Sequence, residues 1–271
     1  MKYDQNLHTH TIYCDGKDTP EEMVQRAIEL GFDSIGFSGH APMKYPIGWA
    51  MSEKNKDAYV KDVTAISEKY KDRIKVYLGL ENDVYADTDL SLYDYIISSV
   101  HFVKIGNEIF GIDCNINDVK QLIDQHFGGN GLKYAKYYYE ELVKINALSR
   151  TDIVGHCDVV SKFSERENFF DVDSKEYQSF ALESITAVAE KNKVFEINTG
   201  AISRGYRTTV YPAPFIMKRL KELDCKFVIS SDCHNRNFLN DKFDDCLLYL
   251  KSFGINKVYK FENGKFIANK I

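Results

Sequence analysis

Seven short apolar runs alternate along this chain with longer segments of helical periodicity, and this alternation restricts the possible folds more than any other feature. Each run is rich in Ile, Val, Phe or Tyr, as buried strands are. The runs cover residues 3–9, 34–38, 75–80, 95–100, 153–155, 194–198 and 227–231. Strands that alternate with helices build a parallel sheet. The pattern therefore predicts an α/β protein, either a closed or nearly closed barrel or an open doubly wound sheet.

Helical patterns fill the gaps between these runs. Thr19-Pro20-Glu21-Glu22 predicts a helix start, with a capping Thr, a Pro at the first position and acids in the first turn. We expect this helix to run to about Leu30 and to end at Gly31. Other helices are predicted near residues 54–70, 118–126, 133–148, 174–191, 214–223 and 242–252. Residues 257–261 and 266–269 flank Asn263-Gly264, which predicts a β-hairpin.

Length and composition fit one folded domain over residues 1–271. The chain has 44% hydrophobic residues, enough for one sizeable core. Its formal net charge is −5 with both signs mixed along the chain, which argues against nucleic-acid or anionic-membrane partners. A small anionic ligand held by a few local Arg or Lys residues stays possible. Neither a signal-peptide run nor a bilayer-spanning stretch occurs, so we expect a cytoplasmic protein.

The histidines favour the barrel over the open sheet. Six of the seven lie at or just past the carboxyl end of a predicted strand, namely His8, His10, His40, His101, His156 and His234. In a parallel barrel these ends converge on one face, where such enzymes place their active sites. His126 is the exception, because it falls at the end of a predicted helix.

Each strand-end motif is weak alone, but together they predict a metal site. His8-Thr9-His10 and Asp232-Cys233-His234 place two ligands on one side of an extended chain. Glu81 ends a predicted strand, and a buried acid is costly unless it is paired or binds a metal. Nitrogen and oxygen donors of this kind suit transition metals. The six cysteines form no C-x-x-C pair, and we interpret them as reduced, small hydrophobic side chains. Those next to the ligands, Cys14, Cys157 and Cys233, are expected to pack behind the site.

These motifs resemble the polymerase-and-histidinol-phosphatase (PHP) superfamily, and within it the monofunctional histidinol-phosphate phosphatases. The resemblance runs nearly end to end. The residues that carry it are His8-x-His10 with Asp15, Gly39-His40, Leu80-Glu81, Ser99-Val100-His101, Gly155-His156-Cys157-Asp158, Glu196-Ile197-Asn198-Thr199 and Ser231-Asp232-Cys233-His234.

The resemblance implies a distorted (β/α)7 barrel that holds three divalent transition metals. The first metal would take His8, His10, Glu81 and Asp232. The second would take Glu81, His101 and His156, so that Glu81 bridges. The third would take Asp15, His40 and His234. The catalytic roles would then fall to Glu81, Asp15, Asp232 and His234.

Phosphomonoester hydrolysis by a hydroxide shared between two metals agrees with this ligand set. The donors fit Zn, Mn or Fe equally well. The substrate would be a small phosphate ester, namely L-histidinol phosphate in histidine biosynthesis. Alternatives are a PHP phosphoesterase for another small phosphate or a nucleotide, and a non-catalytic metal-binding module. The complete ligand set argues against the module.

A phosphate substrate also needs cations on the protein. Arg204 and Arg207 follow the run that ends at Asn198, and Lys162 and Arg166 follow the run before His156. Arg suits bidentate phosphate contacts, so these four are the candidate substrate-binding residues. Arg204 is preferred, because family members resemble this chain in having an Arg between the strand that ends at Asn198 and a following Tyr-Pro, here Tyr211-Pro212.

Overall fold

The computed structural model describes residues 2–45 and 47–271. Seven parallel strands form one sheet in the order β1-β2-β3-β4-β7-β8-β9. Their bounds are β1 (Gln5–Asn6), β2 (Ser34–Phe37), β3 (Lys75–Asp83), β4 (Tyr95–Ser99), β7 (Ile153–Val154), β8 (Val194–Asn198) and β9 (Lys226–Ser230). Each predicted run overlaps one of these strands, although the first forms a strand over only two residues and β3 continues past its run to Asp83.

The sheet curls into a barrel that closes where its first and last strands end. The chain just after β1 bridges the chain just after β9, at Thr9 and Cys233. The amide of His10 donates to the Cys233 carbonyl (2.9 Å), and the Cys233 amide donates to the His8 carbonyl (3.3 Å). These bonds bring the first and last strand ends together, so the structure is a nearly closed barrel and not an open sheet.

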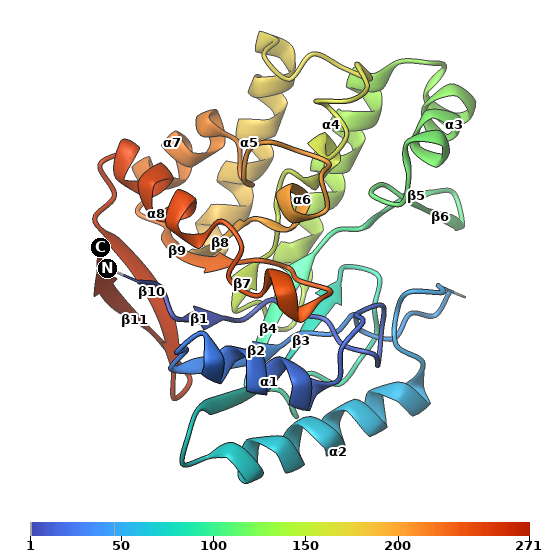
Figure 1. Cartoon of the computed structure of the whole chain (residues 1–271). Helices are drawn as coiled ribbons and strands as arrows, with labels where there is room; N and C mark the ends of the chain where they lie inside the picture. The colour runs from blue at the N-terminus through green and yellow to red at the C-terminus, as the bar shows by residue number, and fades with distance from the viewer. Residues whose placement is uncertain (1, 46) are drawn as a thin grey trace.

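Helices surround the barrel, with α1 and α2 on one side and α4, α5 and α7 on the other (Figure 1). Their bounds are α1 (Pro20–Glu29), α2 (Glu53–Tyr70), α3 (Ile116–Phe127), α4 (Gly131–Leu142), α5 (Lys175–Lys191), α6 (Gly200–Ser203), α7 (Pro214–Glu222) and α8 (Phe243–Ser252). The α1 start is confirmed, because Thr19 and Glu22 form a capping box. Across the described residues, no helix is both long and apolar enough to cross a membrane.

Two expectations on secondary structure need correction. The helix expected over 133–148 ends at Leu142 and continues as a tighter 3-10 turn over Val143–Ala147. A hairpin of β5 (Phe102–Ile105) and β6 (Glu108–Gly111) was not predicted at all. Its turn contains Gly106 at a φ of 63°. A glycine between two short segments of alternating apolar and polar residues is the sequence signal that could have predicted this hairpin.

The barrel interior is layered from apolar to polar. The C-terminal hairpin, β10 (Lys257–Glu262) and β11 (Lys265–Lys270), brings Phe261 against Tyr77 and Tyr95. Gln5, in the first strand, donates to the Phe261 carbonyl and accepts from its amide. The hairpin thus closes the end of the barrel that lies opposite the histidines.

Tyr95 fills the layer above this hairpin. Its ring lies where a Cβ on Gly36 or Gly79 would be, so both positions must be glycine while the ring is there. The Tyr95 hydroxyl donates to the carbonyls of Leu7 and Phe37. One ring therefore links β4 across the barrel to β1 and β2, and the polar side chains begin directly above it.

Candidate metal centre

All nine predicted ligands meet at the carboxyl end of the barrel. Groups of them bring their donor atoms close enough together to bind metal ions. The groups are His10 with Asp15, His40 and His234; His8 with Glu81 and His156; His8 with His10 and Asp232; and His40 with Glu81 and His101. The parallel strands explain this, because consecutive carboxyl ends deliver residues far apart in sequence to the same face.

Glu81 lies at the middle of the cluster, and histidines approach both of its carboxylate oxygens. Nδ1 of His40 is 2.9 Å from Oε2, and Nε2 of His8 is 3.2 Å from it. On the other side, Nε2 of His101 and of His156 lie 3.2 and 3.1 Å from Oε1. This two-sided geometry suits a carboxylate that bridges two ions.

Asp232 and Asp15 supply the remaining carboxylates. Oδ1 of Asp232 lies 3.1 Å from Nε2 of His10, and Oδ2 of Asp15 lies 3.1 Å from Nε2 of His234. Asp232 has a φ of 46°, so its backbone adopts the left-handed conformation, which is uncommon outside glycine. The side chain of Asp15 is 32% exposed, so this part of the cluster is reached by solvent.

Unpartnered buried atoms test whether the cluster fits metal ions. Nε2 of His8, Nε2 of His10 and Oε2 of Glu81 are buried, and none has a hydrogen-bond partner among the described residues. Leaving such atoms without a partner costs free energy. These donors are of the type that transition metals bind, so the residues fit the group that the sequence predicts.

Glu196 supports the cluster from behind. Its Oε2 lies 2.8 Å from Nδ1 of His8 and accepts from the Ser230 hydroxyl at 2.6 Å. Its Oε1 accepts from the His156 amide at 2.6 Å and from the Asn198 side chain. A carboxylate on Nδ1 fixes the tautomer that presents Nε2 to a metal. No separate role is predicted for Glu196 from the sequence, although an acid inside an apolar run is a signal.

The acids of the cluster are held in the ionised form that binds metals. Burial raises the pKa of Glu81, but the positive charges of His8, His101 and His40 outweigh it and hold the pKa well below its ordinary value. The pKa of Asp232 is also held low against burial, mainly by Arg204.

The imidazoles behave differently from one another. Burial, with the neighbouring imidazoles of His234 and His40, lowers the pKa of His10 to about 3. For His8, burial lowers the pKa, but the carboxylates of Glu196 and Glu81 outweigh it and hold the pKa well above its ordinary value. Neutral imidazole is the form that binds metals, so metal uptake at His8 must displace a proton.

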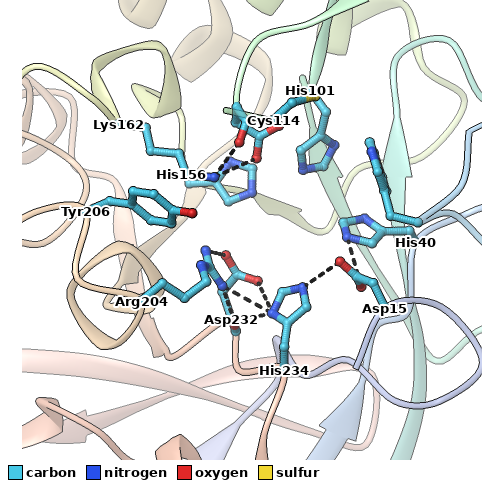
Figure 2. A pocket seen from close by; sticks show the side chains of 12 residues that line it. Asp15, His40, His101, Cys114, His156, Lys162, Arg204, Tyr206, Asp232 and His234 are labelled. Atoms are coloured by element: carbon cyan, nitrogen blue, oxygen red, sulfur yellow. Dashed lines mark hydrogen bonds and ion pairs between the residues drawn. The ribbon is translucent and has the colours of Figure 1, made fainter. Parts of the chain in front are cut away.

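A cleft of about 280 Å³ opens over the cluster. Figure 2 shows Arg204 beside Asp232 and His234, with Lys162 and Cys114 near His156. The ring of Trp49 lies on Phe102 (centroids 5.4 Å apart, interplanar angle 6°) and forms an aromatic wall beside His40. The side chains that line the cleft without belonging to the ligand set are Trp49, Asp113, Cys114, Lys162, Arg204 and Tyr206. Asp113, Cys114 and Tyr206 were not predicted.

The structure brings two of the four cationic candidates into the cleft. Arg204 donates to Oδ2 and the backbone carbonyl of Asp232, at 2.9 and 2.8 Å. Lys162 lies 4.7 Å above the centroid of the Tyr206 ring and contacts Asp113. Both charges therefore face the space above the metal ligands.

The other two candidates lie outside the cleft. Arg207 does not line the cleft, and it donates to the hydroxyls of Ser161 and Thr209. Arg166 is exposed, and its guanidinium lies over the outer side of Tyr206. His126 is also separate, because its ring packs on Phe110 in the last turn of α3.

The cysteines near the ligands pack beside them as predicted. All six are free thiols. Cys157 and Cys233 are buried, and Cys14 is partly buried with Sγ 3.5 Å from Nδ1 of His10. Burial raises the pKa of the Cys14 and Cys233 thiols to about 12, which disfavours the thiolate form that binds metals.

Comparisons with known proteins agree with this geometry. Residues 6–200 match the family described as the PHP domain. A probable histidinol-phosphatase from Deinococcus radiodurans is 29% identical over 262 residues, which cover 91% of this chain and 92% of that protein. The histidinol-phosphatase of Bacillus subtilis is 24% identical, over 84% of this chain and 92% of its own.

A solved structure shows that the fold is shared. Histidinol phosphate phosphatase from Lactococcus lactis, complexed with Zn, L-histidinol and phosphate, matches with a TM-score of 0.76 at 20% identity. The match covers 97% of this chain and 98% of that one. The expected distorted (β/α)7 barrel is therefore confirmed.

Proposed function

This chain belongs to the PHP domain family, and on that premise we propose that it hydrolyses L-histidinol phosphate to L-histidinol and phosphate. The observation that carries the proposal is Glu81, whose two oxygens each face a pair of histidines at the floor of an open cleft. The names of the relatives from Deinococcus radiodurans and Bacillus subtilis, and the ligands of the Lactococcus lactis structure, support the choice of substrate.

We assign three divalent transition-metal ions to the cluster, each Zn, Mn or Fe. The ligand sets are His8, His10, Glu81 and Asp232; Glu81, His101 and His156; and Asp15, His40 and His234. When bound, such ions would neutralise phosphate charge and activate water for attack on phosphorus. Glu81 and Asp232 would hold ions from below, and the supporting carboxylate of Glu196 would keep His8 in the binding tautomer.

Arg204 and Lys162 would bind the phosphate oxygens that face away from the cluster. Both line the cleft, and the charge on a phosphoryl group stays high throughout its transfer. Arg204 can offer a planar fork, whereas Lys162 offers a point charge. The contact between Arg204 and Asp232 holds the guanidinium beside the cluster before substrate arrives.

Asp15 and His234 form the part of the cluster that solvent reaches. Their side chains are 32% and 22% exposed and lie 3.1 Å apart. We assign both to the third ligand set, where they would hold an ion that could activate water at the cleft entrance. The substrate imidazole would lie against Trp49, which lines the cleft and has the buried ring of Phe102 stacked behind it.

A panel of phosphate esters tests this proposal. Metal-free protein would be reconstituted separately with Zn, Mn and Fe(II), then assayed with L-histidinol phosphate, glycerol phosphate, p-nitrophenyl phosphate and nucleoside monophosphates. We expect kcat/KM for L-histidinol phosphate to exceed the others by roughly 100-fold or more. A higher kcat/KM for a nucleotide or another ester would assign that ester as the substrate. No turnover with any ester or metal would indicate a non-catalytic module.

A further inference from the structure

A second cavity lies directly behind the wall of the cleft. It encloses about 420 Å³, within the usual range for small-molecule sites. Two chain segments separate it from the cleft. Ser161 faces the cavity while its neighbour Lys162 faces the cleft, and Arg207 faces the cavity while Arg204 and Tyr206 face the cleft. The two spaces therefore share their dividing wall.

Arg207 is the charged group at the base of this cavity. Its side chain is only 7% exposed, and its guanidinium lies 4.7 Å over the Tyr211 ring. Its hydrogen bonds go to two neutral hydroxyls, those of Ser161 and Thr209. Nε has no hydrogen-bond partner among the described residues. A buried guanidinium in this state is expected to bind an anion.

Among the described residues Glu165 forms an ion pair with Arg207, but the pair is long. Oε1 of Glu165 is 3.7 Å from Nε, beyond hydrogen-bond length. Asp158 lies behind, where Ala213 donates to its Oδ2. By contrast, Arg204 in the cleft contacts a carboxylate of Asp232 at 2.9 Å. Of the two arginines, Arg207 is therefore the one without a carboxylate at hydrogen-bond distance.

The rest of the lining restricts what the anion can be. Glu165 and Asp173 bring negative charge to the rim, and Lys218 brings one further positive charge. A phosphate dianion would be repelled by both acids. A ligand with one carboxylate and one ammonium can pair its carboxylate with a cation and its ammonium with an acid. Apolar surface from Val172, Tyr177, Pro214 and Phe215 completes the cavity.

We propose that this cavity is a second binding site for an α-amino acid with an apolar or aromatic side chain. Its carboxylate would bind Arg207, its ammonium would bind Glu165 or Asp173, and its side chain would pack against Tyr177 and Phe215. Because the wall is shared, occupancy would shift Arg204 and Lys162 and so change turnover in the cleft. This inference does not depend on which phosphate ester the cleft hydrolyses.

Calorimetric titration of the metal-loaded protein with each of the twenty common amino acids tests the site. We expect saturable binding of apolar or aromatic members that persists in saturating inorganic phosphate, which occupies the cleft. Arg207→Gln should weaken binding at least tenfold, and Arg204→Gln should leave it within about twofold. Turnover measured at a saturating concentration of the bound amino acid should differ from turnover without it.

A surface pair keeps the test valid if Arg207→Gln fails to fold. Asp173 is exposed at the rim, so Asp173→Asn should fold normally and weaken amino-acid binding. Glu176→Gln alters an exposed acid that is close in sequence but outside the cavity, and it should leave amino-acid binding unchanged. The proposal is overturned if no amino acid binds at millimolar concentration. It is also overturned if phosphate displaces the bound amino acid, or if Asp173→Asn and Arg207→Gln bind it as tightly as the unaltered protein.

Discussion

Oε2 of Glu196 lies 2.8 Å from Nδ1 of His8, and this contact places a carboxylate behind an imidazole that is fully buried. The same carboxyl group accepts the His156 amide through its other oxygen. One side chain on β8, a strand without an assigned metal ligand, thus fixes ligands from two other strands. It is a positioning residue, and its contribution can be measured separately from direct ligation.

Replacement of Glu196 by Gln should weaken metal binding without abolishing it. The amide keeps the size of the side chain, but it no longer provides the charge that favours the Nδ1–H tautomer of His8. Loss of such a partner costs roughly 10- to 100-fold in metal affinity. Competition with a chelator of known affinity measures this, and activity should return at high metal concentration. Equal affinity in the variant and the unaltered protein would contradict the role.

Removal of metal should abolish turnover, and Glu81 should be the most sensitive ligand. Glu81→Gln changes two proposed ligand sets at once, so the isolated protein should lose more than one metal equivalent by elemental analysis. His234→Ala, in the third set alone, is the matched control and should lose about one. Full turnover by chelator-treated protein, verified as metal-free, would contradict metal-dependent hydrolysis.

Arg204→Ala should reduce kcat/KM by roughly 100- to 1000-fold, or about 3–4 kcal/mol, through loss of the phosphate contact. Metal content should be unchanged, because Arg204 contacts Oδ2 of Asp232 while Oδ1 faces His10. Arg204→Lys should recover only part of the loss, since a point charge does not replace a planar fork. Arg166→Ala, which alters an exposed cation outside the cleft, serves as the control. If Arg204→Ala hydrolysed the substrate normally, the phosphate contact would have to be reassigned, first to Lys162.

His126→Ala should leave turnover near normal, whereas His101→Ala and His156→Ala should not. His126 lies in the last turn of α3, where a cation complements the helix dipole, and its ring packs on Phe110. Its loss should lower the free energy of unfolding by about 0.3–1 kcal/mol from the dipole, plus the ring contact. Urea unfolding and steady-state kinetics on the same samples separate the two effects. Equal kinetic loss in all three variants would undermine the placement of the site at the strand ends.

Trp49→Ala should raise KM for L-histidinol phosphate more than for glycerol phosphate. Trp49 lines the cleft with Phe102 stacked behind it, so its ring offers a flat surface to an imidazole, and glycerol has no ring to place there. Aromatic contacts of this type contribute about 0.5–1.5 kcal/mol, so we expect a difference of several-fold in KM. The same loss for both esters would show that Trp49 supports the cleft without contacting the ring.

The clustering of the proposed ligands was predictable, because parallel strands bring positions that are far apart in the sequence to one face of the barrel. His101, His156 and Asp232 each come directly after an apolar run, and His8 lies near the end of one. The sequence could not predict which way Arg207 faces. It lies in an irregular loop after α6, where no periodicity relates a residue number to a direction.

The same limit applies to the rest of the cleft. Asp113 and Cys114 follow the β5–β6 hairpin, and Tyr206 lies in the loop after α6, so no apolar run marks them. The sequence pattern does not predict the hairpin, because the apolar run over residues 95–100 ends directly before His101. Its short strands, with Gly106 in the turn, form a separate two-stranded sheet.

The close packing of Tyr95 against two glycines has a genetic consequence, because its side chain occupies the space that Gly36 and Gly79 leave open. A methyl group at Gly36 would first meet the Tyr95 hydroxyl, whereas one at Gly79 would meet the ring itself. Suppressors of a Gly36→Ala defect should therefore need space at both Tyr95 and Leu7, because Cε1 of Tyr95 and Cδ2 of Leu7 also lie 2.9 Å from that methyl group. Suppressors of Gly79→Ala should need a much smaller residue at position 95. Across diverging lineages, we expect these three positions to covary even where every metal ligand stays the same.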